Sequence, residues 1–183
     1  KTTPGGQWSL TPFERPANPQ PVISPNSNSS FLDPMTNKMV NWEANDTFNP
    51  AAVVKGDSIY VLYRAEDKSG VGIGKRTSRL GLAASADGLT MKTRPTPVMY
   101  PANDNQKEFE WPGGCEDPRV ALTEDGTYVM LYTQWNKKVP RLAVATSKDL
   151  ITWEKHGSAF RTAHQGKFFN KPSKSASIVT SIR

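Results

Sequence analysis

Short apolar segments separated by polar turns recur along this chain. Segment 48–54 and the Tyr-rich segment 58–63 flank Gly56-Asp57, a pattern that predicts a β-hairpin. Segment 79–85, rich in Gly and Ala, predicts a further strand that packs closely against its neighbours. Long apolar stretches with a 3.6-residue period are scarce, and 15 prolines and 13 glycines favour turns. We therefore predict an all-β fold.

The same order of elements occurs a second time. Both copies begin with Asn-Pro or Asp-Pro, and both end in a small-residue strand followed by Ser-x-Asp. The second copy comprises segments 116–122, 125–132 and 141–147. Such a meander leaves one side that it cannot bury alone, and radial stacking of several copies around an axis solves this problem. The repeat therefore predicts a β-propeller.

The repeat also predicts how the chain is divided. We expect an N-terminal segment at 1–47, one blade at 48–115, a second blade at 116–173 and the start of a third at 174–183. A propeller needs about four to eight blades. We therefore expect the chain to be truncated at residue 183, or the remaining blades to come from another chain. The chain begins with Lys1 and not with Met, which fits a mature secreted N-terminus or a linker.

Charge and composition limit which classes of partner the protein can bind. The net charge of +6 would suit an anionic partner, but Lys and Arg are scattered and no nucleic-acid-binding motif accompanies them. We predict no nucleic-acid partner. Cys115 is the single cysteine, so an intrachain disulfide and a cysteine-based zinc site are excluded. His156 and His164 lack partners at metal-ligand spacing, and no apolar run approaches the roughly 18 residues of a membrane span.

Two dense polar clusters are candidates for chemistry. The first surrounds one hairpin and contains Asn49, Arg64, Glu66 and Asp67; the second occupies 111–119 and contains Gly113, Gly114, Glu116, Asp117 and Arg119. Polar groups at strand starts converge from several blades of a propeller, and an Asp beside an Arg is arranged for a tuned carboxyl group. Asp-Pro is also a common turn opener, and Asp beside Arg is often a structural ion pair. Catalytic and structural roles both stay open on these grounds.

Four ordered motifs resemble glycoside hydrolase family 130. They read WEANDTFNPAA at 42–52, VLYRAED at 61–67, TSRLGLA at 77–83 and GGCEDPR at 113–119. The resemblance runs from about Trp8 to the end of the chain. It implies a five-bladed β-propeller of roughly twice this length, of which this chain supplies roughly the first two blades and the start of a third. It also implies an enzyme that acts on β-linked mannose with inversion.

The resemblance implies roles for particular residues. Asp117 matches the general acid, which is thought to pass its proton through a hydroxyl of the mannose. The positions of Asn49, Arg64 and Arg79 lie in the substrate pocket, and Glu116 and Arg119 complete the predicted substrate-binding set. Arginines would make bidentate contacts that lysines cannot. No metal and no organic cofactor is implied, although inorganic phosphate is the co-substrate in the phosphorylases of the family.

Three functions stay open from the sequence. The first is a glycosidase that hydrolyses β-1,2-mannosides, with a β-mannoside oligosaccharide as partner; its second carboxylate, about 6.5 to 9.5 Å from the acid, is expected in later blades. The alternatives are phosphorolysis of β-1,4-mannosides to mannose 1-phosphate, and a non-catalytic sugar-binding propeller. A furanosidase is disfavoured because Asn49 stands where those enzymes place an Asp. We expect a periplasmic or secreted protein, or a cytoplasmic one if it is a phosphorylase, and homo-oligomer formation stays open.

Overall fold

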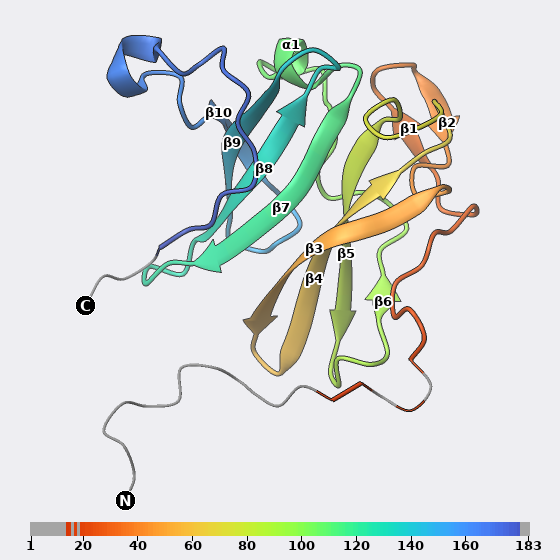
Figure 1. Cartoon of the computed structure of the whole chain (residues 1–183). Coiled ribbons are helices and arrows are strands. Elements are labelled where there is room, and N and C mark those ends of the chain that lie inside the picture. Colours follow the sequence, from red (N-terminus) through yellow and green to blue (C-terminus); the bar gives the residue numbers. More distant parts are fainter. Residues whose placement is uncertain (1–13, 16, 18, 180–183) are drawn as a thin grey trace, which may run out of the picture.

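One eight-stranded sheet makes up most of the molecule, and it consists of two antiparallel meanders of four strands, which we call the first and second sheets (Figure 1). The computed structural model describes residues 14–15, 17 and 19–179. The first sheet contains β3 (Asp46–Lys55), β4 (Ser58–Glu66), β5 (Ser78–Ser85) and β6 (Lys92–Thr93). The second contains β7 (Gly114–Leu122), β8 (Tyr128–Trp135), β9 (Pro140–Ser147) and β10 (Glu154–Ser158). The hairpin β1 (Phe31–Asp33) and β2 (Lys38–Val40), the four-residue helix α1 (Lys107–Glu110) and the 3-10 turn η1 (Ala163–Gly166) complete these elements.

The predicted all-β class is confirmed. The two sheets do not close a ring, so the five-bladed propeller stays a prediction, and so does the division into blades. Parts of the predicted segments 1–47 and 174–183 lie outside the described residues. No helix in the described ranges is long and apolar enough to cross a membrane.

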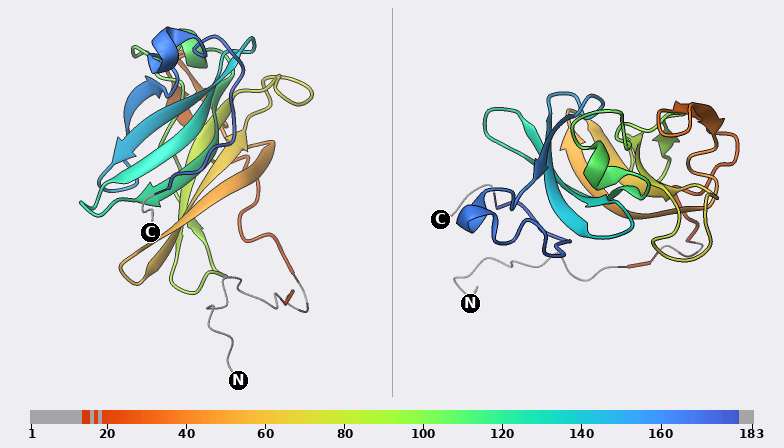
Figure 2. Two further views of the ribbon diagram at one scale, coloured as in Figure 1. Left: turned by 60° about the vertical axis from the view of Figure 1, so that its left-hand side comes forward. Right: turned by 90° about the horizontal axis from the view of Figure 1, so that it is seen from above.

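One close backbone contact joins the two sheets. Ser78 of β5 pairs in parallel with Gly114 of β7, and the Ser78 amide donates to the Gly113 carbonyl at 2.9 Å. Gly114 has φ of +107°, and a Cβ added there would lie 2.0 Å from the Ser78 carbonyl oxygen. Only glycine fits this position. The sheets meet at this junction and diverge toward the opposite end (Figures 1 and 2).

Apolar side chains fill the space between the sheets. The larger core contains Leu62 and Leu80 from the first sheet, and Met130 and Ala143 from the second. A smaller core lies beneath β1 and β2 and includes Trp42 and Tyr63. Small residues permit this packing, because a Cβ at Gly81 would lie 2.3 Å from the Tyr63 ring.

A buried tyrosine–glutamate pair occurs once in each sheet. Tyr63 donates its hydroxyl to Glu43, 20 residues earlier, at 2.7 Å, and Tyr132 donates to Glu110, 22 residues earlier, at 2.8 Å. Burial raises the pKa of both glutamates. Each sheet is thus tied to the segment that precedes its first strand.

The Ser-x-Asp turns repeat in detail as well. Asp87 accepts hydrogen bonds from the backbone amides two and three residues ahead, at 2.8 Å each. Asp149 does the same at 2.8 and 2.7 Å. The predicted repeat therefore extends from strand order to the hydrogen bonds of its turns.

Candidate active site

Two strand bulges direct side chains to one point. Asn49 in β3 and Asp117 in β7 have φ of +47° and +51°, and each precedes a proline where the strand register shifts. Left-handed backbone at a residue other than glycine costs about 1 to 3 kcal/mol and is concentrated at functional sites. Bulges re-aim side chains. Here they bring the Asn49 amide nitrogen to 2.8 Å from the Asp117 carboxylate.

Arg64 of β4 occupies the centre of the site. Its guanidinium lies 2.7 Å from Glu66, 2.9 Å from Glu116 and 3.0 Å from Asp117, and its side chain is 6% exposed. The Arg64 Nε also donates to the Ser78 hydroxyl at 3.0 Å. A planar guanidinium with five donors can serve several carboxylates at once. Arg64 therefore sets the spacing of the acidic groups.

Lys174 adds a second cation from beyond the second sheet. Its Nζ lies 3.0 Å from Glu116 and 3.3 Å from Asp117. The next residue, Ser175, has φ of +56°, as Asn49 and Asp117 do in the first and second copies. The start of a third blade is predicted at 174–183, but Lys174 is not among the predicted site residues. When Ser175 is aligned with Asp117, Lys174 takes the position equivalent to Glu116. This correspondence is the signal in the sequence that points to Lys174.

The neighbouring carboxyl groups have pKa values that are shifted apart. Burial raises the pKa of Glu116 above its ordinary value despite the nearby charges of Arg64 and Lys174. Burial also acts to raise the pKa of Asp117, but the Asn49 hydrogen bond and the Arg64 charge outweigh it, so that pKa is lowered. Environments that separate the pKa values of paired carboxyl groups are typical of acid–base sites.

Not every predicted site residue joins this cluster. The structure brings together Asn49, Arg64, Glu116 and Asp117. Arg79 is 1% exposed and instead pairs with Asp67 at 2.8 Å and with Asp33 at 3.1 Å.

Arg119 is also outside the cluster. Its guanidinium donates to the neighbouring Pro118 carbonyl at 2.7 Å. It forms no ion pair with any other residue that the structure describes.

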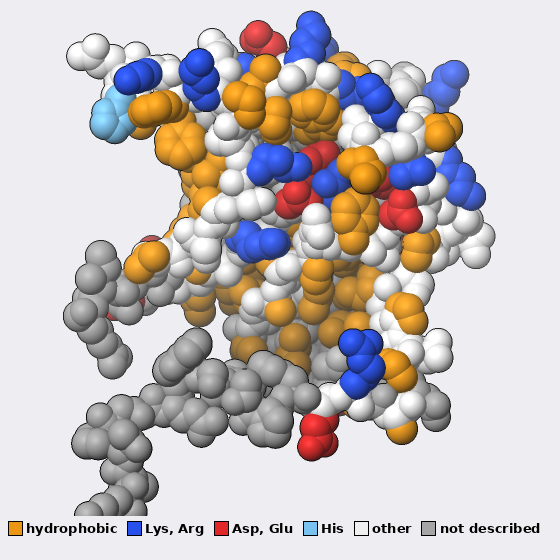
Figure 3. All heavy atoms as spheres, in the orientation of Figure 1, with side chains coloured by type: hydrophobic (Ala, Val, Ile, Leu, Met, Phe, Trp, Pro, Cys, Tyr) orange, Lys and Arg blue, Asp and Glu red, His pale blue; other side chains and the backbone are white. Residues whose placement is uncertain are grey.

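The site consists of acidic and basic side chains in close contact. Acidic and basic side chains gather between β7 and the end of β4 on the face shown in Figure 3. Arg64 and Lys174 face the three carboxylates of Glu66, Glu116 and Asp117. Across the described part of the chain, no group of three or more His, Cys, Asp or Glu is arranged to hold a metal ion. The arrangement can donate and accept hydrogen bonds and can transfer protons.

The repeated antiparallel meanders converge on a hydrogen-bonded set of carboxylates and an arginine, and paired carboxyl groups are the groups that glycosidases use. The profile of a glycoside hydrolase family described as β-1,4-mannooligosaccharide phosphorylase matches residues 15–183. The chain belongs to this family, glycoside hydrolase family 130. Its members are phosphorylases and hydrolases that act on mannosides.

Individual relatives give the same family. A 1,2-β-oligomannan phosphorylase of Thermoanaerobacter sp. (strain X514) is 36% identical over 144 residues, which are 75% of this chain and 43% of the relative. The crystal structure of a glycosyl hydrolase from Bacteroides ovatus is 63% identical with a TM-score of 0.89, over 92% of this chain and 47% of that chain. The chain thus spans about half the length of these relatives.

A second similar structure bears on the chemistry of the family. It comes from work reporting that this family of mannoside phosphorylases contains glycoside hydrolases that target β-1,2 mannosidic linkages in Candida mannan. It is 62% identical with a TM-score of 0.89, over 92% of this chain and 47% of that chain.

Proposed function

We propose that this chain carries part of the active site of an inverting enzyme that cleaves β-mannosidic linkages, and that its reaction is hydrolysis of β-1,2-mannosides. The contact of Asp117 with both Asn49 and Arg64 carries this proposal. Two repeats each accept backbone strain to place one of these polar groups at a shared point. A purely structural ion pair would not need such a bulge in both sheets.

Asp117 is the group that handles the proton. In the resting protein its lowered pKa keeps it a carboxylate that can accept a hydrogen bond from a mannose hydroxyl. Burial is the largest influence on this pKa and acts to raise it, so a bound sugar that excludes more water favours the protonated form. The proton then passes through that hydroxyl to the leaving oxygen as the glycosidic bond breaks. Water attacks the anomeric carbon and gives its proton to a second carboxylate.

The charge balance supports water as the attacking group. A phosphorylase must bind a phosphate dianion, and this requires cations that are free to meet it. Arg64 and Lys174 are both committed to carboxylates, and Arg79 is buried in a separate set of ion pairs. Arg119 forms no ion pair among the described residues, but it lies outside the cluster and donates to the Pro118 carbonyl. The similar structures with about 60% identity include one reported with β-1,2-mannoside hydrolysis, whereas the phosphorylase relative is 36% identical.

Phosphorolysis is the second candidate. The matching family profile is described as a β-1,4-mannooligosaccharide phosphorylase, and Lys174 is 40% exposed, so a phosphate could draw it away from the carboxylates. In that case inorganic phosphate is the co-substrate and mannose 1-phosphate is the product.

The proposal also covers the complete fold and the location of the protein. We propose that the two meanders are the first blades of a five-bladed propeller and that 174–179 begins the third, which the repeated left-handed backbone conformation at Ser175 supports. We also propose a periplasmic or secreted protein, because the motif WEANDTFNPAA at 42–52 resembles exported hydrolases of the family more than its cytoplasmic phosphorylases.

Product analysis with the full-length protein tests the function. β-1,2-Mannobiose is supplied with and without inorganic phosphate, and the products are followed by proton NMR from the first turnover. We expect α-mannose in both cases, since inversion converts the β-linkage to an α-product. Mannose 1-phosphate formed only with phosphate would establish phosphorolysis instead. No product from any β-mannoside would refute an enzyme and leave a sugar-binding protein.

A further inference from the structure

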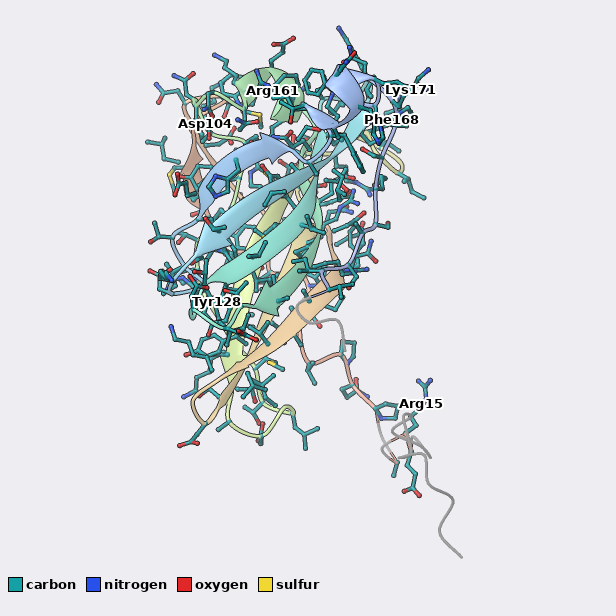
Figure 4. The ribbon with its side chains drawn as sticks, turned by 90° about the vertical axis from the view of Figure 1, so that its left-hand side faces the viewer. Arg15, Asp104, Tyr128, Arg161, Phe168 and Lys171 are labelled. Atoms are coloured by element: carbon teal, nitrogen blue, oxygen red, sulfur yellow. The ribbon has the colours of Figure 1, made fainter. Side chains whose placement is uncertain are left out.

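A groove lies at the seam between the outer parts of the two sheets, away from Asp117. It has a volume of about 450 Å³, which is in the range of ligand-binding pockets. One wall is the segment 97–105, which follows the first sheet, and the other is the turn before β10. Figure 4 views this side of the second sheet, with Asp104 above and Tyr128 below. No residue of the candidate active site lines the groove.

Trp153 gives the groove a fixed aromatic surface. Its indole nitrogen donates to the Leu150 carbonyl at 3.1 Å, and its ring packs against the larger core while remaining half-buried. A ring held in this way offers apolar contact area with little further loss of side-chain entropy. The corresponding residue of the first sheet is Met91, so the aromatic group belongs to the second repeat alone.

An amide and a hydroxyl side chain lie beside the Trp153 ring. Asn105 and Thr152 are exposed and line the groove from opposite walls. The Asn105 side-chain oxygen accepts from Gln106 at 2.9 Å, which leaves its amide N–H groups available to a ligand. Amide and hydroxyl groups beside an aromatic face match a ligand that carries both hydroxyl and C–H groups.

The charge of the groove disfavours an anion. Lys155 is the cation that lines it, and its side chain is 10% exposed. It pairs with Asp104 at 3.2 Å and with the fully buried Glu110, so two carboxylates compensate one ammonium group. The Lys155 ammonium also donates to the Tyr100 carbonyl at 2.8 Å. A neutral ligand therefore fits better than a phosphate or a nucleic acid.

We propose that this groove is a second saccharide-binding site, which holds a neutral oligosaccharide chain at a distance from the site of cleavage. Trp153 provides the stacking surface, and Asn105 and Thr152 provide hydrogen bonds to sugar hydroxyls. Such a site would keep a long substrate on the protein between cleavage events. The inference does not depend on whether Asp117 catalyses hydrolysis.

Titration of the full-length protein with β-1,2-mannotriose tests this site. The protein is ¹⁵N-labelled and carries Asp117→Asn so that the sugar is not consumed. The indole N–H resonance of Trp153 is identified by its loss in Trp153→Met, the residue found in the first repeat. We expect a saturable shift of this resonance with the sugar and none with inorganic phosphate. Absence of the shift, or an equal shift with phosphate, would overturn the proposal.

A double variant with a matched control locates the binding. Asn105→Leu with Thr152→Val removes both polar partners and should weaken the titrated affinity by about tenfold or more. Asn103→Leu with Thr90→Val changes an exposed neighbour and the equivalent turn of the first sheet, and should leave the affinity unchanged. Equal loss in both variants would contradict the proposal. Mannose release by either double variant without Asp117→Asn reports the active site separately, so failure of the proposed function is distinguishable.

Discussion

Asn49 donates a 2.8 Å hydrogen bond to Asp117 across 68 residues of sequence, and both residues lie in left-handed bulges that precede a proline. The two positions are equivalent in the two repeats. The bond therefore connects the same point of two consecutive sheets, with Arg64 as the common partner of the surrounding carboxylates.

The Asp117→Asn variant tests the proton-transfer role. We expect kcat to fall by about a hundredfold or more, because the amide cannot deliver a proton, while sugar affinity is largely retained. Steady-state kinetics with β-1,2-mannobiose and calorimetry measure the two effects. Asp125→Asn changes an exposed carboxylate in the β7–β8 turn and is the control. Normal turnover by Asp117→Asn would exclude the role.

The Arg64→Leu variant tests the buried ion-pair centre. Glu66 and Glu116 would lose their shared cation, and breaking a buried pair costs about 3 to 5 kcal/mol. The free energy of unfolding in denaturant should fall by that amount. Arg119→Leu is the control and should change it by less than about 0.5 kcal/mol, since Arg119 bonds only its neighbouring carbonyl among the described residues. Similar losses in both variants would argue against Arg64 as the centre.

The Gly114→Ala variant tests the junction of the sheets. A Cβ there would meet the Ser78 carbonyl at 2.0 Å, and φ is also positive, so we expect a loss of about 3 kcal/mol or more in unfolding free energy. Gly126 also has positive φ, but nothing lies within 4 Å of a Cβ added there. Gly126→Ala should therefore cost only about 1 kcal/mol. Equal costs would show that the close contact is unimportant.

The Asp149→Asn variant tests the repeated turn through pH. Hydrogen bonds from the Thr152 and Ile151 amides lower the pKa of Asp149 from 3.8 to about 2. Because the folded pKa is lowered, its contribution to stability is complete above pH about 4 and is lost as the pH falls toward 2. The wild type should therefore exceed Asp149→Asn in unfolding free energy at neutral pH, and the difference should shrink in that window. A difference independent of pH would contradict this assignment.

Most of the strand order could be predicted from the repeat, since Asn-Pro, Asp-Pro and Ser-x-Asp mark equivalent points in both copies. The convergence of Asn49 with Asp117 followed from the same alignment. Closure into five blades could not be predicted from residues on this chain alone, because closure depends on the number of sheets that pack around the axis.

Arg79 lies apart from the Asp117 cluster because side chains alternate along a strand, and its role in substrate binding stays a prediction. Ser78 contacts Arg64 in the site, so Arg79, the next residue of β5, lies on the opposite face with Asp67. The same alternation separates Glu66 from Asp67. Arg119 lies outside the cluster for a different reason: the bulge between Glu116 and Arg119 shifts the alternation of side chains, so sequence spacing no longer gives the face of the sheet. Its role in substrate binding also stays a prediction.

The tyrosine–glutamate pairs have a consequence for how such chains can be recombined. Tyr63 and Tyr132 each donate to a glutamate that precedes the first strand of their own sheet. The glutamate lies 20 residues before Tyr63 and 22 residues before Tyr132. A crossover placed at the strand start would leave a buried phenol without its acceptor. The portable segment in duplication or chimera design therefore begins before Glu43 or Glu110, and hybrids joined upstream of these residues should be the ones that fold.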